Sequence, residues 1–180
     1  MSKNKSLSRV IVPCRFSYLY CFEPNSINEN DAKYSVSAII PKEDTKTIAK
    51  IEKAIEIAKQ DSIQKWGGKI PSNLKTPLRD GDLERPDDEA YRGCYFFNAN
   101  SKHKPEVVDK RVQPILEQNE VYSGCYGRIS VTFYGYNSNG NQGIAAGLGN
   151  IQKIIDGEPL GERASATEDF QAVSDEDFLS

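Results

Sequence analysis

The sequence predicts a mainly β protein, a small and partly closed antiparallel barrel of about five strands with one inserted helix. Three observations lead to this fold class. Segments rich in β-branched and aromatic residues recur along the chain, a single stretch has helical periodicity, and strands do not alternate with helices as a parallel sheet requires. The 180 residues fit one domain of about 150–160 residues followed by a tail.

The N-terminal part contains two predicted strands. Residues 9–22 are rich in Val, Ile, Tyr and Phe and form a long strand, in which Pro13 indicates a bulge or an edge position. Residues 24–31 have turn composition, and residues 34–40 form the second strand.

One helix is expected over about residues 45–65. Its apolar stripe at helical spacing consists of Ile48, Ile51, Ile55 and Ala58. Asp44 or Thr45 can cap its start, and the glycine pair at 67–68 ends it. The next segment, residues 69–90, is polar, contains Pro and Gly, and has almost no periodicity. It therefore predicts a long loop, which in a compact domain is usually functional or mobile.

The C-terminal half contains the remaining strands. Residues 91–99 predict a third strand, residues 107–109 a short one, and residues 124–137 the clearest strand of the chain. A hairpin loop at 137–142 leads to its partner at 143–151. Alternation in the clearest strand is regular. We expect Gly127, Ile129, Val131, Phe133 and Gly135 to face the core, and Tyr126, Arg128, Ser130, Thr132, Tyr134 and Tyr136 to face outward.

The outward strip has the ingredients of a surface for single-stranded nucleic acid. Bases stack on aromatic faces whatever their identity, and cations follow the backbone. The alternative is a solvent-facing strand in which Tyr and Thr only reflect strand propensity. Aromatic and basic residues recur together elsewhere, which favours the first interpretation. The candidate contacts are Arg15, Tyr18, Lys33, Lys69, Arg79, Arg92, Tyr95, Phe96, Lys102, Lys104, Tyr126, Arg128, Tyr134 and Tyr136.

Catalytic and metal sites have little support in the sequence. Asp80, Asp82 and Glu84 can in principle bind a divalent ion as in a nuclease, but carboxylates in such a loop are more often simply exposed. A single histidine argues against a Ser-His-Asp triad, and four cysteines without a Cys-x-x-Cys pair argue against zinc and favour ordinary buried thiols. We therefore expect a non-enzymatic binder without a cofactor.

Charge is distributed unevenly along the chain. The last seventeen residues carry five acids and no Lys or Arg, so the remaining 163 residues hold 23 basic against 21 acidic side chains, a net charge of +2. Such a tail cannot bury enough apolar surface to fold alone. We expect it either to compete with a polyanionic ligand or to bind partner proteins through Asp175, Glu176, Asp177 and Phe178, although acidic termini also occur merely as solubilising ends.

Several sequence blocks, in this order, resemble a family of phage-encoded single-stranded-DNA-binding proteins formerly catalogued as a domain of unknown function. The blocks are Trp66–Pro71, Leu78–Asp82, Gly93–Ser101, Pro105–Asp109, Tyr122–Asn137, Gly143–Lys153 and Gly157–Gly161. The resemblance implies an oligonucleotide-binding (OB) fold and sequence-independent binding of single strands in phage DNA replication, recombination and repair. It also implies an acidic tail that covers the groove and recruits replication proteins. The end of this chain, Asp-Phe-Leu-Ser, departs from a terminal aromatic residue.

The resulting expectation is a DNA-binding domain over residues 1–161 and a disordered acidic tail over 162–180, in a protein of the infected cell's cytoplasm that can form a homodimer. No run approaches the length of a membrane helix, and the start of the chain lacks the apolar block of a signal peptide. Two rivals remain: an interaction protein whose tail mimics DNA, and a metal-dependent nuclease.

Overall fold

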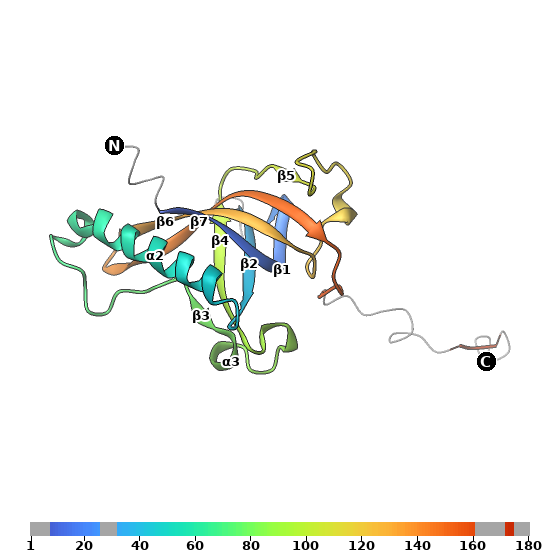
Figure 1. Ribbon diagram of the computed structural model, residues 1–180, viewed down its shortest axis with the longest axis horizontal. Coiled ribbons are helices and arrows are strands. Elements are labelled where there is room, and N and C mark those ends of the chain that lie inside the picture. Colours follow the sequence, from blue (N-terminus) through green and yellow to red (C-terminus); the bar gives the residue numbers. More distant parts are fainter. Residues whose placement is uncertain (1–7, 26–31, 161–171, 175–180) are drawn as a thin grey trace.

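A five-stranded barrel forms the body of the protein (Figure 1). A computed structural model describes residues 8–25, 32–160 and 172–174. The barrel strands are β1 (Arg9–Asn25), β2 (Lys33–Pro41), β4 (Cys94–Ser101), β6 (Tyr126–Ser138) and β7 (Asn141–Ile155). They pair in the order β4-β2-β1-β6-β7, and a further pairing of β4 with β7 closes the barrel. The predicted mainly β, five-stranded barrel is confirmed.

The closing contact is the one departure from an antiparallel barrel. β4 and β7 run parallel, with Ala99 opposite Ala146 and Asn100 opposite Gly147, whereas the other four barrel pairings are antiparallel. A parallel contact follows from the connectivity, because β7 returns from the β6–β7 hairpin in the direction of β4. The short strand β5 (Val107–Val108) also joins β7 in parallel.

Helix α2 (Thr45–Asp61) lies where the periodicity predicts it. The Asp44 carboxylate accepts a hydrogen bond from the Thr47 amide at 3.3 Å and caps its start. The predicted stripe is buried, and the helix packs against β1 and β6 (Figure 1). After the 3₁₀ turn η2 (Ile63–Trp66), Gly67 takes a left-handed conformation (φ 74°) that ends the helical region.

Residues 79–93 contain more structure than the expected loop. They form β3 (Arg79–Asp80), α3 (Gly81–Glu84) and η3 (Glu89–Tyr91), and β3 pairs with β4. This stretch, called the cover segment below, buries Tyr91 against Ile39 and Phe96 on the outer side of β2 and β4. The third strand consequently begins at Cys94, later than predicted, because residues 91–93 belong to the cover segment.

The alternation predicted for residues 126–136 is confirmed with one exception. Ile129, Val131 and Phe133 are buried in the barrel core. Ser130, expected to face solvent, is only 6 % exposed, because its hydroxyl accepts a hydrogen bond from the Asn150 amide at 2.7 Å. The remaining short element is η4 (Gln118–Glu120). Among the described residues, no helix combines the length and apolarity needed to cross a membrane.

Candidate nucleic-acid interface

An open cavity of about 600 Å³ lies on the outer face of the barrel. We call it the central groove. Its lining includes Arg15, Ile39, Cys94, Tyr126, Arg128 and Ile155. These residues come from β1, β2, β4, β6 and β7, so the register of the barrel, rather than any one loop, sets the shape of the groove.

Arg15 and Tyr126 form a cation–aromatic pair in this groove. They are direct cross-strand partners of β1 and β6, and the Arg15 guanidinium carbon lies 5.1 Å from the centre of the Tyr126 ring. Hydrogen bonds from Arg15 to the carbonyl oxygens of Gly124 (3.1 Å) and Glu158 (2.8 Å) fix the guanidinium. Tyr126 is 45 % exposed. The pair therefore presents an aromatic surface beside a positive charge, the combination that binds an unpaired base and its phosphate.

Arg128 continues the positive charge along the same face of β6. Its Nε donates to the Gln152 side-chain oxygen at 2.9 Å. Arg128 lines both the central groove and a second cavity of about 270 Å³ that also contains Arg9, Ile11 and Val112. The groove thus extends past Arg128 toward the start of β1.

Tyr18 lies beyond the other end of the central groove. It has a positive φ of 45° at a bulge in β1, where the pairing with β2 shifts register between Ser17 and Tyr20. The exposed rings of Tyr18 and Tyr20 line a third cavity of about 370 Å³, which shares Ala90 with the central groove. Of the aromatic candidates, Tyr18 and Tyr126 are therefore brought onto one continuous surface.

Other candidates lie away from the central groove. Tyr134 is exposed, but eight residues along β6 from Tyr126 correspond to roughly 26 Å. Tyr136 packs across the hairpin onto Gly143. Lys33 and Lys102 lie at the far ends of β2 and β4, next to the Tyr34–Ser101 pair, and the exposed Lys104 follows in the turn after β4. Lys69 is exposed in the connection after η2.

The expectation that Phe96 offers a stacking surface is wrong for this structure. Strand geometry points its ring outward, but the cover segment buries it to 2 % exposure. The Tyr91 ring meets it edge to face at 4.9 Å, and the Arg85 guanidinium lies 5.2 Å from its centre. Tyr95, on the opposite side of β4, is partly buried with the Lys42 ammonium 5.2 Å from its ring centre.

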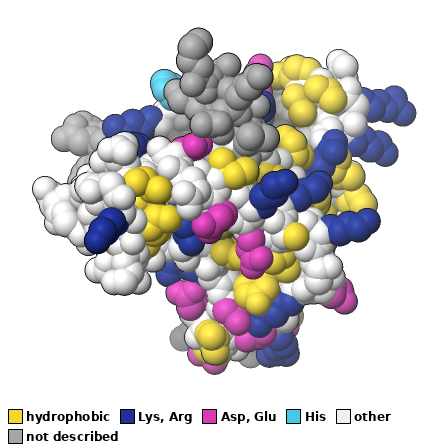
Figure 2. Space-filling view, turned by 60° about the vertical axis from the view of Figure 1, so that its left-hand side comes forward, with side chains coloured by type: hydrophobic (Ala, Val, Ile, Leu, Met, Phe, Trp, Pro, Cys, Tyr) yellow, Lys and Arg dark blue, Asp and Glu magenta, His cyan; other side chains and the backbone are white. Residues whose placement is uncertain are grey.

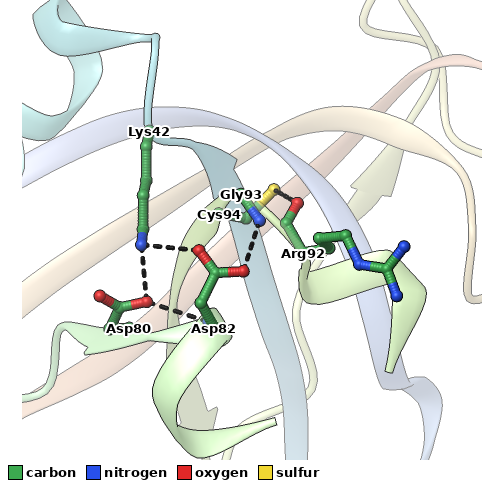
Figure 3. Close-up of polar contacts among 6 residues, drawn as sticks. All are labelled: Lys42, Asp80, Asp82, Arg92, Gly93 and Cys94. Carbon is green, nitrogen blue, oxygen red and sulfur yellow. Dashed lines mark hydrogen bonds and ion pairs between the residues drawn. The ribbon is translucent and has the colours of Figure 1, made fainter. Parts of the chain in front are cut away.

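The carboxylates that suggested a metal site instead hold a lysine (Figure 3). The Lys42 ammonium lies 2.8 Å from both Asp80 and Asp82, and its hydrogen bonds lower the pKa of each carboxyl group. Asp82 also accepts the Gly93 amide at 2.9 Å, which ties the two ends of the cover segment together. Within the described residues, no group of three or more potential ligands has the geometry to hold a metal ion.

Two predicted basic contacts belong to the cover segment. Arg79 forms an ion pair with Glu84 at 2.7 Å, so its charge is partly engaged. The Arg92 side chain is exposed and points away from the Lys42 cluster (Figure 3). Figure 2 shows acidic and basic side chains intermixed toward the bottom of the surface, where Figure 1 places β3 and α3. In this part of the surface, positive charge is therefore offset by neighbouring acidic side chains.

All four cysteines are free thiols; Cys14, Cys21 and Cys125 are buried, and Cys94 is half-buried. Burial raises the pKa of Cys14 far above its usual range and that of Cys21 to about 11. Both thiols therefore stay protonated at neutral pH and are poor nucleophiles.

Sequence reasoning missed Arg9, Ile11, Arg85, Val112 and Gln152. Arg85 contacts the rings of Tyr18, Tyr91 and Phe96, with its guanidinium carbon about 5 Å from each ring centre. It lies in a segment without periodicity, so no local signal marked it. Arg9 and Ile11 share the outward face of β1 with Arg15, and extending the period-two rule along β1 identifies both.

Comparison with known proteins places the chain in a family. A family model described as "Enterobacter phage Enc34, ssDNA-binding protein" matches residues 8–179. The chain belongs to this family. The match includes the acidic end of the sequence, whose residues Asp175, Glu176, Asp177 and Phe178 lie outside the described part of the structure.

Individual relatives agree with this assignment. Protein p50 of Acyrthosiphon pisum secondary endosymbiont phage 1 is 34 % identical over 172 residues, which cover 89 % of this chain and 90 % of p50. The single-stranded DNA-binding protein of bacteriophage Enc34, solved in complex with ssDNA, superposes with a TM-score of 0.74 at 25 % identity, over 86 % of this chain and 90 % of that one. The fold is also that of gp2.5, a single-stranded DNA-binding protein of bacteriophage T7 (TM-score 0.59, 14 % identity, 90 % and 92 % coverage).

Proposed function

We propose that this protein binds single-stranded DNA without sequence preference, through the outer face of its barrel, during phage DNA replication, recombination and repair in the infected bacterium. The observation that carries the proposal is the Arg15–Tyr126 pair in the open central groove. The family supports it, since the Enc34 relative is a single-stranded DNA-binding protein solved with ssDNA. The proposed role is that of a binder and not of an enzyme.

Binding combines stacking with phosphate neutralisation. Tyr126 and Tyr18 offer rings to successive bases, while Arg15 and Arg128 lie beside them for the phosphates. Lys33, Lys69, Arg92, Lys102 and Lys104 are exposed cations that can guide the strand at the ends of the barrel, and Arg79, Tyr134 and Tyr136 are weaker candidates. Each phosphate neutralised on a single strand contributes about 0.7 to the salt slope of the affinity, so binding weakens as salt rises.

The last residues that the structure describes before the acidic tail lie beside the groove, which supports competition with DNA. Arg15 donates to the Glu158 carbonyl, and Leu160 donates its amide to Ser123 and lines the cavity of Tyr18. The fifteen residues that follow Leu160, up to Asp175, reach at most about 54 Å when extended, enough to bring the acids over the groove. We propose that residues 162–180 lower DNA affinity, and that their last acidic residues and Phe178 recruit a replication or recombination protein.

The test is fluorescence anisotropy of a labelled single strand of about 30 nucleotides, longer than the site of one OB fold, against the same sequence as duplex. Full-length protein is compared with a variant ending at residue 163. The proposal expects salt-sensitive binding of the single strand that tightens when the tail is removed. No binding by either form would refute DNA binding and favour an interaction protein. Mg²⁺-dependent cleavage of the strand that disappears in Asp80→Ala would instead establish the nuclease.

Tail competition is tested separately from DNA binding. If the full-length and shortened proteins bind equally at low salt, the groove is free of the tail and only that part of the proposal fails. Light scattering of the free protein decides whether it is a homodimer.

A further inference from the structure

The second cavity, beyond Arg128, has its own apolar and basic lining. We call it the distal cavity. It is lined by Arg9, Ile11, Val112, Arg128, Asn150 and Gln152, among others. Ile11 and Val112 are both large apolar side chains left exposed on its surface, and Arg9 is exposed beside them. Apolar side chains can contact the face of an unpaired base, and a cation at the edge can neutralise its phosphate.

The turn at residues 109–113 gives this cavity one wall. The Asp109 carboxylate accepts the amides of Arg111 at 2.8 Å and Gln113 at 3.0 Å, and these backbone bonds lower the pKa of Asp109. Val112 takes a left-handed conformation (φ 64°) with 66 % of its surface exposed. A β-branched residue rarely adopts this conformation, and such strain tends to occur where a segment contacts a ligand.

Gln152 connects the turn to the central groove. Its side-chain oxygen accepts from Arg128, and its Nε2 donates to the Asp109 carbonyl at 3.2 Å. The side-chain amide of Gln152 therefore fixes the position of Arg128 relative to the turn at residues 109–113. Lys110 and Arg111 extend from the turn as exposed side chains, and neither forms an ion pair with a carboxylate among the described residues.

We propose that the distal cavity is a second nucleotide subsite, which continues the DNA path beyond the central groove. This inference rests on the proposed function. A base lies on Ile11 and Val112, and Arg9 with the turn cations Lys110 and Arg111 neutralises the adjoining phosphates. Arg9 and Arg15 lie six residues apart on β1, roughly 20 Å, so only a strand of several nucleotides reaches both sites.

The experiment compares salt-dependent affinities for a short and a long oligonucleotide, of about 4 and about 16 nucleotides, which span the range of OB-fold site sizes. The double variant Lys110→Gln/Arg111→Gln is expected to lower the salt slope on the long strand by about 1.4 and to leave the short strand unchanged. Its matched control is Lys50→Gln/Lys53→Gln, which removes two exposed cations from α2 and is expected to leave both slopes at wild-type values.

Val112→Gly tests the apolar wall without endangering the fold, because glycine adopts a positive φ at no steric cost. It is expected to weaken long-strand binding on the order of fivefold at an unchanged salt slope. Wild-type slopes and affinities in both variants would overturn the subsite while leaving short-strand binding, and so the proposed function, intact. Failure of the wild-type protein to bind either strand would overturn both proposals. A Val112→Gly variant that loses a dimer but binds DNA normally would instead make this face an interface between copies.

Discussion

Replacing Tyr126 by Ala is the most direct test of the central groove. The Arg15 guanidinium lies over the Tyr126 ring, so the exposed part of the ring has room for one stacked base. One base stack is worth about 1–3 kcal/mol, which corresponds to a rise in Kd of about 5- to 150-fold. Tyr126→Phe keeps the ring and is expected to bind within about twofold of wild type, since stacking depends on the π-face.

The assay is anisotropy of a labelled single strand over a series of salt concentrations, with tail-deleted protein so that competition does not obscure the effect. Tyr126→Ala removes no cation, so its salt slope is expected to equal that of wild type while Kd rises at every salt concentration. Thermal unfolding of each variant confirms an intact barrel. Wild-type affinity in a folded Tyr126→Ala protein would refute the reasoning, because the ring would then carry no base.

Three further predictions concern the barrel and its cover. Gly127→Ala is expected to destabilise the protein by about 1–3 kcal/mol or more, because a Cβ there would overlap the Gln152 carbonyl and lie 2.7 Å from Phe16 Cζ. The control Gly147→Ala, whose Cβ would meet nothing closer than 3.4 Å, is expected to stay within about 1 kcal/mol of wild type in urea unfolding; equal losses would contradict this packing. Tyr91→Phe removes a buried hydrogen bond of 2.9 Å to Ser37 and is expected to cost about 1 kcal/mol in the same assay, whereas an unchanged midpoint would show that the bond contributes nothing. The lowered pKa values of Asp80 and Asp82 mean that the Lys42 contact stabilises the folded protein above pH 3.8 and is lost as the pH falls through their folded-state values. Protection of the amides of residues 79–93 against hydrogen exchange, measured relative to their intrinsic rate at each pH, is therefore expected to fall there in wild type but not in Lys42→Met.

The elements that could be predicted from the sequence are those with local periodicity. The apolar stripe of α2 and the alternation of β6 each follow from one repeating interval, and neither depends on distant contacts. Both outward-facing groove residues of β6, Tyr126 and Arg128, were found in this way. Ser130 is buried, contrary to the alternation, because its hydroxyl accepts a hydrogen bond from the Asn150 amide on β7. This contact depends on strand pairing and not on the sequence pattern of β6.

The cover segment could not be predicted, because distant residues stabilise it. Its elements are two to four residues long, too short for a periodic signal. Lys42 anchors one end of the segment through ion pairs with Asp80 and Asp82. In the middle of the segment, the Arg85 guanidinium packs over the rings of Tyr18 in β1 and Phe96 in β4. The error at Phe96 has the same origin, since the segment that covers this side chain has no local signal in the sequence.

The parallel contact between β4 and β7 has a consequence for how the protein is made. β1 is made early but pairs with β6, which is made much later, and β4 pairs with β7, the last strand of the barrel. Each of these pairings therefore forms only after the later strand has been synthesised. A chain emerging from the ribosome therefore exposes the free edge of β1 until β6 appears, and β4 lacks its β7 partner until β7 is made. Such unpaired edges invite association with other chains. Closure through contacts so distant in sequence is also intrinsically slow. The barrel therefore closes only once β7, the last of its five strands, has been made.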